Sequence, residues 1–133
     1  MFKKIKQILY RSLETKEISY KKLEEIMKNN PKAILVDVRS KQEYNEGHLD
    51  GSINIPLYDL EKQLEKLPDK QCTMVIYCRS GHRSRQAKEK LEKFGYENIY
   101  NLKDGLDGMW ILHPIFLSHL QKNRIKYVYQ ARV

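Results

Sequence analysis

Short apolar runs separated by polar turns predict the strands of this chain. Residues 33–38 and 73–77 are almost continuously apolar, a pattern typical of strands buried on both faces of a parallel sheet. Briefer runs at 53–55 and 99–102, with Ile18 as a short edge strand, bring the expected total to about five. We therefore expect an α/β fold, with a mainly parallel sheet and helices on both faces.

Helical periodicity alternates with these runs. Apolar residues recur at three- and four-residue spacing after Ser19, within 57–67 and within 84–94, as in helices that bury one face. Ser19 is expected to cap the first of these helices and Gly95 to end the last. A short helical turn and a bend at Gly47-His48 are expected to connect two of the strands.

Residues 78–84, here called the Cys78 loop, join the strand 73–77 to the helix that follows. Unpaired N–H groups and the helix dipole stabilise an anion at a helix N-terminus. Arg79 and Arg83 add positive charge, and Gly81 permits a positive φ with which successive N–H groups turn inward. We therefore expect Cys78 to be nucleophilic. Taken singly, such a cysteine is most often a small buried apolar residue, and such arginines are often solvated.

Polar residues after three strands should meet at one edge of the sheet, because functional groups collect beyond the carboxyl ends of parallel strands. They are Asp37 and Arg39, Cys78, and the turn 103–105. Asp37 is expected to accept backbone N–H bonds and fix its loop rather than to move a proton. Arg39 is expected to pair with an acid such as Glu43, with substrate contact as the lesser alternative.

The Cys78 loop looks like the active-site loop of the rhodanese family of sulfurtransferases, and other landmarks of that family occur in order. The matching motifs are residues 35–39, Glu43-Tyr44, residues 47–56, Gly95-Tyr96, residues 98–102 and Asp104-Gly105. The resemblance covers about residues 18 to 110 and implies the three-layer rhodanese-like fold. One departure lies in the closing motif, where Asp104 replaces the first of two glycines and Trp110 falls one position late. Substrate preference is therefore open.

The resemblance implies a covalent sulfur relay at Cys78. The thiolate would attack the outer sulfur of a donor such as thiosulfate, release sulfite and keep a persulfide, whose terminal sulfur a thiol or cyanide then takes. Substrate would be held by the other residues of the loop, which are Arg79, Ser80, Gly81, His82, Arg83 and Ser84. Asp37 and Arg39 would support the loop, and His48 would form a hydrogen bond in its turn. This chemistry needs no histidine base, and the resemblance implies neither a metal nor an organic cofactor.

Two other function classes stay open. Cysteine phosphatases and arsenate reductases use a related loop, but the phosphatase pattern is Cys-x5-Arg, whereas Cys78 to Arg83 is Cys-x4-Arg. The tighter loop favours a single sulfur atom over a tetrahedral phosphate. Alternatively, the domain is a non-turnover sulfur carrier or a recognition module, with a partner protein as the donor or acceptor.

The net charge of +8 lies mostly at the two ends of the 133-residue chain. Residues 1–17 hold five Lys or Arg against two Glu, and residues 114–133 hold four against none. The charge is therefore poor support for nucleic-acid binding by the middle of the chain. We expect a basic amphipathic extension at 1–17, a rhodanese-like domain at 18–112 and a basic tail at 113–133.

Both flanks show weak patterns of their own. Residues 2–13 have the spacing of an amphipathic helix, which is expected to pack on the domain or on a second subunit rather than lie on an anionic membrane surface. In the tail, Leu112, Phe116 and Leu120 share a helical face, and residues 125–131 alternate as in a strand. The tail is expected either to wrap its own domain or to dock a partner. The oligomeric state is open.

Cysteine spacing and hydropathy suggest a reduced, cytoplasmic protein. Cys72 and Cys78 lie at opposite ends of one predicted strand, roughly 20 Å apart, whereas a disulfide needs Cα atoms within about 7 Å. No apolar run exceeds five residues, too few to span a bilayer. The N-terminus also lacks the continuous apolar stretch of a secretion signal.

Overall fold

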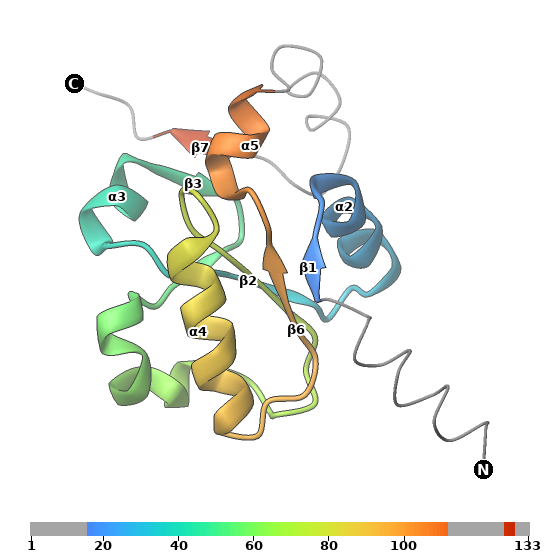
Figure 1. The fold of residues 1–133 in the computed structure, drawn as a ribbon, viewed down its shortest axis with the longest axis vertical. Coiled ribbons are helices and arrows are strands. Elements are labelled where there is room, and N and C mark those ends of the chain that lie inside the picture. Colours follow the sequence, from blue (N-terminus) through green and yellow to red (C-terminus); the bar gives the residue numbers. More distant parts are fainter. Residues whose placement is uncertain (1–15, 112–126, 130–133) are drawn as a thin grey trace.

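The computed structural model describes residues 16–111 and 127–129, and a five-stranded parallel sheet lies at their centre (Figure 1). The strand order is β1-β6-β5-β2-β4, and all neighbouring strands run parallel. The strands are β1 (Glu17–Ile18), β2 (Ile34–Asp37), β4 (Ile53–Asn54), β5 (Met74–Tyr77) and β6 (Ile99–Leu102). The α/β class and the parallel sheet predicted from the sequence are confirmed.

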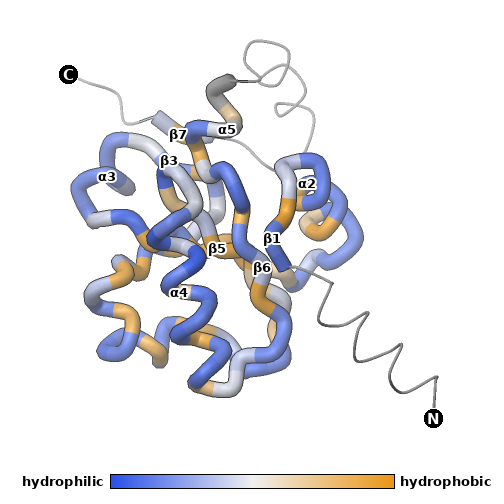
Figure 2. Tube along the Cα trace, viewed as in Figure 1, coloured by the Kyte–Doolittle hydropathy of each residue, from blue (hydrophilic) through white to orange (hydrophobic). Residues whose placement is uncertain are grey.

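Helices cover both faces of this sheet. α2 (Tyr20–Asn29) and α5 (Gly105–Ile111) pack on one face, whereas η1 (Leu57–Lys66) and α4 (His82–Lys93) pack on the other. Successive side chains of a strand point to opposite faces, so Leu35 joins the first core and Val36 joins the second. Figure 2 shows the apolar colour along β5 in the middle of the molecule. The three layers expected from the resemblance are therefore present.

A second, two-stranded sheet lies next to α3 (Lys41–Glu46). Its strands, β3 (Gly47–Leu49) and β7 (Tyr127–Tyr129), pair antiparallel, with Leu49 opposite Tyr127. The prediction of a bend at Gly47-His48 is therefore wrong, because these residues begin a strand whose partner is far along the chain. The strand-like alternation predicted for 125–131 is confirmed for 127–129.

Two helices differ from their predictions. η1 is a 3-10 helix that is interrupted at Gln63, where the backbone (φ −122°, ψ 22°) is not helical. Leu57 and Leu60 are three residues apart, a spacing that suits a 3-10 turn as well as an α-helix, so the pattern did not separate the two. α4 begins at His82, two residues before the predicted start, because Gly81 occupies the N-cap position.

Several predictions fall outside the described residues. They are the helix at 2–13 and the helical face of Leu112, Phe116 and Leu120. The domain boundaries at 1–17, 18–112 and 113–133 also stay predictions. Within residues 16–111 and 127–129, no helix is long and apolar enough to cross a membrane.

Candidate active site

Cys78 follows β5 directly and lies under the N-terminus of α4. Its sulfur accepts hydrogen bonds from the backbone N–H groups of Gly81 at 3.1 Å and Ser84 at 3.4 Å, and the Ser84 hydroxyl lies 3.3 Å from it. The Cys78 side chain is fully buried. Three polar groups therefore surround one sulfur atom at the positive end of a 12-residue helix. Such an arrangement stabilises a sulfur anion.

Gly81 gives the Cys78 loop its shape, and β6 holds Gly81 in place. Its φ is +95°, and a Cβ atom there would lie 1.9 Å from the carbonyl oxygen of Lys103, so no side chain fits. Asn101, fully buried on β6, donates from Nδ2 to the Gly81 carbonyl at 3.2 Å and to the Glu17 carboxylate at 2.6 Å. Sequence reasoning missed Asn101; its signal was a polar residue inside an otherwise apolar strand.

The turn after β6 packs against the base of the loop. The Leu106 N–H donates to the Cys78 carbonyl at 3.0 Å, and the Asp107 N–H donates to the Arg79 carbonyl at 2.8 Å. A Cβ atom on Gly105 would lie 2.5 Å from the Arg79 carbonyl oxygen, which explains the glycine at this close approach. These contacts confirm that the turn 103–105 and Cys78 meet at one edge of the sheet.

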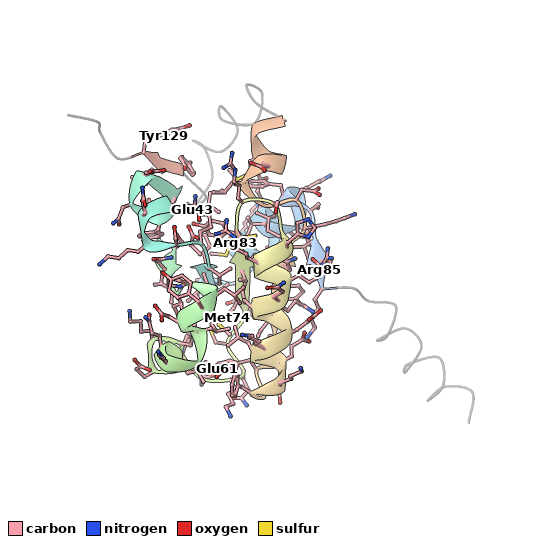
Figure 3. All side chains as sticks on the ribbon, turned by 60° about the vertical axis from the view of Figure 1, so that its left-hand side comes forward. Glu43, Glu61, Met74, Arg83, Arg85 and Tyr129 are labelled. Atoms are coloured by element: carbon pink, nitrogen blue, oxygen red, sulfur yellow. The ribbon has the colours of Figure 1, made fainter. Side chains whose placement is uncertain are left out.

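Arg83 is bound to Glu43 across the site. Its Nη1 and Nη2 donate to the two carboxylate oxygens of Glu43 at 2.6 Å and 3.0 Å, and Figure 3 shows the two side chains pointing toward one another. Hydrogen bonding to Arg83 lowers the pKa of Glu43 to about 2, and the same pairing raises the pKa of Arg83. The prediction that Glu43 pairs with Arg39 is therefore wrong. Ser40 and Glu43 form a capping box on α3, and this leaves the carboxylate facing α4.

Arg39 pairs with Asp37 instead. The Arg39 guanidinium donates to both Asp37 oxygens, at 2.7 to 3.1 Å, and to the Gly47 carbonyl at 2.7 Å. Burial alone would lower the pKa of Arg39, but its hydrogen bonds and charge attraction to Asp37 outweigh burial and raise it. Asp37 also accepts the Arg39 backbone N–H at 2.9 Å, so the expectation that Asp37 fixes its neighbouring loop is confirmed.

The other predicted site residues lie at the rim of the loop. Arg79, Ser80 and His82 are exposed, and Arg79 forms a 3.3 Å ion pair with Asp107. Away from the loop, His48 is bonded through Nδ1 to the Tyr44 carbonyl at 2.8 Å. The expected hydrogen bond of His48 is thus confirmed, although it lies in a strand rather than in a bend.

A cavity of about 220 Å³, here called the loop-side cavity, opens next to Arg79. Its lining includes Arg39, Glu43, Arg79, Leu106, Asp107 and Tyr127. The cavity is therefore bounded by the residue that follows Cys78, by the partner of Arg83 and by the first turn of α5. Within the described ranges, no group of three His, Cys, Asp or Glu side chains is placed to hold a metal ion, and Cys72 and Cys78 are both free thiols.

Fold and site together define an α/β domain in which a buried cysteine is held by an inward-turned loop at a helix N-terminus. The family model for the Rhodanese-like domain matches residues 19–111. The chain belongs to the rhodanese-like domain family.

Relatives with this domain differ in their names and in their length. Thiosulfate sulfurtransferase PspE of Escherichia coli K12 is 41% identical over 73 residues, which are 52% of this chain and 70% of that protein. A tRNA uridine(34) hydroxylase of Buchnera aphidicola is 30% identical over 112 residues, which are 80% of this chain but only 30% of the hydroxylase. The chain thus spans less than a third of the hydroxylase's length.

Solved structures show the same fold. The human single-domain sulfurtransferase TSTD1 matches with a TM-score of 0.66 and 25% identity, over 74% of this chain and 97% of that one. Family membership therefore supports sulfur transfer in general, whereas the donor and the acceptor remain to be proposed.

Proposed function

We propose that this protein is a rhodanese-type sulfurtransferase that moves the outer sulfur of thiosulfate to a thiol or cyanide acceptor through a persulfide on Cys78. One observation carries the proposal: the Cys78 sulfur accepts N–H bonds from Gly81 and Ser84 at the N-terminus of α4. The name of the PspE relative, thiosulfate sulfurtransferase, supports the choice of donor.

The chemistry needs only the sulfur and its surrounding donors. The Cys78 thiolate attacks the outer sulfur of thiosulfate, the S–S bond of thiosulfate breaks, and sulfite leaves with the electron pair. The resulting persulfide carries its negative charge on a terminal sulfur about 2 Å further out. The N–H groups of His82 and Arg83 lie in the first turn of α4, where helix geometry leaves donors free to bind an anion. The loop therefore stabilises the charge both before and after transfer.

The phosphatase alternative is less well supported. A loop arginine that binds phosphate offers two parallel N–H groups to two oxygens of the tetrahedral anion. In this chain both terminal nitrogens of Arg83 donate to Glu43, so the pair of N–H groups that would bind phosphate is already bonded. Arg79 is then the loop arginine better placed to attract the donor, since its ion pair with Asp107 is exposed and weak.

Steady-state kinetics test the proposal. Varying thiosulfate against a thiol should give parallel double-reciprocal lines, as expected when a covalent intermediate separates two half-reactions. Cys78→Ser should abolish turnover, whereas the matched control Cys72→Ser should retain it, because Cys72 precedes β5 at the end of the strand away from the Cys78 loop. The phosphatase alternative would instead be established if the protein hydrolysed an aryl phosphate in a Cys78-dependent way and released no sulfite from thiosulfate. A persulfide that forms but is passed on only to a partner protein would establish the sulfur carrier.

A further inference from the structure

One wall of the loop-side cavity comes from a residue far along the chain. Tyr127 belongs to β7, yet it lines the cavity together with Arg79 and Asp107. Its ring lies directly over Gly47: a Cβ atom on Gly47 would fall 2.8 Å from Tyr127 Cζ. The lack of a side chain at Gly47 therefore makes the space in which Tyr127 lies.

Tyr127 is held in this position from two sides. Its backbone is part of the ladder between β3 and β7, where it pairs with Leu49. Its side chain lies beside that of Arg39 in the lining of the cavity, and Arg39 is itself fixed by Asp37 and by the Gly47 carbonyl. The half-buried ring also packs against the core cluster that contains Leu106. Tyr127 is therefore a fixed wall of the cavity.

The cavity that Tyr127 limits is small and adjoins the sulfur-bearing loop. Arg79 follows Cys78 in the chain, and Leu106, another lining residue, donates its N–H to the Cys78 carbonyl. A volume of about 220 Å³ lies below the roughly 300–1,000 Å³ of sites for drug-sized ligands. It therefore suits a small ligand rather than a drug-sized one.

We propose that Tyr127 is a specificity-determining residue, which confines the loop-side cavity so that a small free thiol is the sulfur acceptor and a cysteine within a polypeptide is excluded. The inference rests on the proposed function, because it concerns the second half of the sulfur transfer. In that step the acceptor thiolate attacks the terminal sulfur of the persulfide, the S–S bond to Cys78 breaks, and Cys78 leaves as a thiolate. The acceptor keeps the sulfur as its own persulfide, so no oxidant or reductant is consumed.

Single-turnover transfer separates this inference from the proposed function. The full chain is first loaded with thiosulfate, freed of excess donor, and checked by intact mass for one added sulfur atom. The loaded protein is then mixed with 2-mercaptoethanol or with a peptide of about ten residues that carries one central cysteine, and loss of the added sulfur is followed over time. Because each variant is tested with the same two thiols, the thiols' own reactivities cancel in the comparison.

Tyr127→Ala should raise the ratio of the peptide transfer rate to the 2-mercaptoethanol transfer rate about tenfold relative to wild type. Gly47→Ala should act in the same direction, since its new methyl group displaces the ring without removing it. It also keeps the inference testable if the loss of Tyr127 unfolds the protein. Tyr58→Ala, at an exposed side chain outside the loop-side cavity, is the control and should match wild type.

Two results would overturn the inference. If loading succeeds and the peptide-to-2-mercaptoethanol rate ratio is the same in wild type, Tyr127→Ala and Gly47→Ala, Tyr127 does not select the acceptor. If wild type gains no sulfur at the loading step, the proposed function fails and this inference fails with it. The two failures are seen at different steps and cannot be confused.

Discussion

Replacing Glu43 by glutamine should make the protein less stable in a pH-dependent way. Glu43 accepts two hydrogen bonds from Arg83, and this pairing lowers the pKa of Glu43 from 4.5 to about 2. Since the pKa is lower in the folded state, the ionised carboxylate favours folding. Its contribution is complete above the unfolded-state pKa of about 4.5 and is lost as the pH falls toward 2.

The size of the effect follows from the pKa and from exposure. Taken alone, the fall in the pKa of Glu43 corresponds to about 3 kcal/mol at neutral pH. However, the Glu43 and Arg83 side chains are 31% and 39% exposed, and pairs in contact with water are strongly screened. We therefore expect Glu43→Gln to lower the free energy of unfolding by about 1 kcal/mol at pH 7. At pH 3 the difference in the free energy of unfolding between wild type and Glu43→Gln should be about half of its value at pH 7 or less.

Urea unfolding of wild type and Glu43→Gln at pH 7 and at pH 3 measures this difference. Glu46→Gln, on the same helix and exposed, controls for the loss of one surface carboxylate and should change the free energy of unfolding by less than about 0.5 kcal/mol at either pH. A Glu43→Gln effect that is equally large at both pH values would refute the ion-pair explanation, as would a protein indistinguishable from wild type at pH 7.

Three further substitutions test the loop and its supports. Gly81→Ala should lower the free energy of unfolding by more than about 2 kcal/mol in urea titrations, because its Cβ meets the Lys103 carbonyl at 1.9 Å where φ is +95°. Asn101→Leu should slow alkylation of Cys78 by iodoacetamide several-fold, since the Gly81 carbonyl loses its 3.2 Å donor, whereas Asn98→Leu should match wild type. Tyr77→Phe should lower the melting temperature, with a loss of about 1–2 kcal/mol, because the buried Tyr77 hydroxyl accepts the Leu49 N–H and bonds the Ser52 hydroxyl.

Features encoded by neighbouring residues could be predicted from the sequence. The apolar runs of β2 and β5 indicated buried parallel strands, and Ser19 caps α2 as expected, accepting the Lys22 N–H at 3.2 Å. The Cys78 loop was equally visible, because a strand, a glycine-containing turn and a helix start are contiguous in the chain. Local propensity and spacing suffice where both partners of an interaction lie within a few residues.

Pairings between distant segments could not be predicted in the same way. The Arg83–Glu43 pair joins two helices, and Asn101 reaches the loop from a different strand. Several acids and bases of suitable charge occur in the sequence, and only the packed fold decides which of them meet. Arg39 shows the difficulty, since Asp37 and Glu43 were both available and only the former lies within its reach.

The central claim is that Cys78 carries a persulfide, and intact mass tests it most directly. Wild type, Cys78→Ser and Cys72→Ser would be incubated with thiosulfate, separated from it by gel filtration and weighed with and without added dithiothreitol. We predict a gain of one sulfur mass in wild type and Cys72→Ser, reversed by dithiothreitol and absent from Cys78→Ser. The account would be contradicted if wild type gained no mass while Cys78 still reacted with iodoacetamide. The Cys78 thiol would then be accessible and reactive, and yet it would not accept sulfur from thiosulfate.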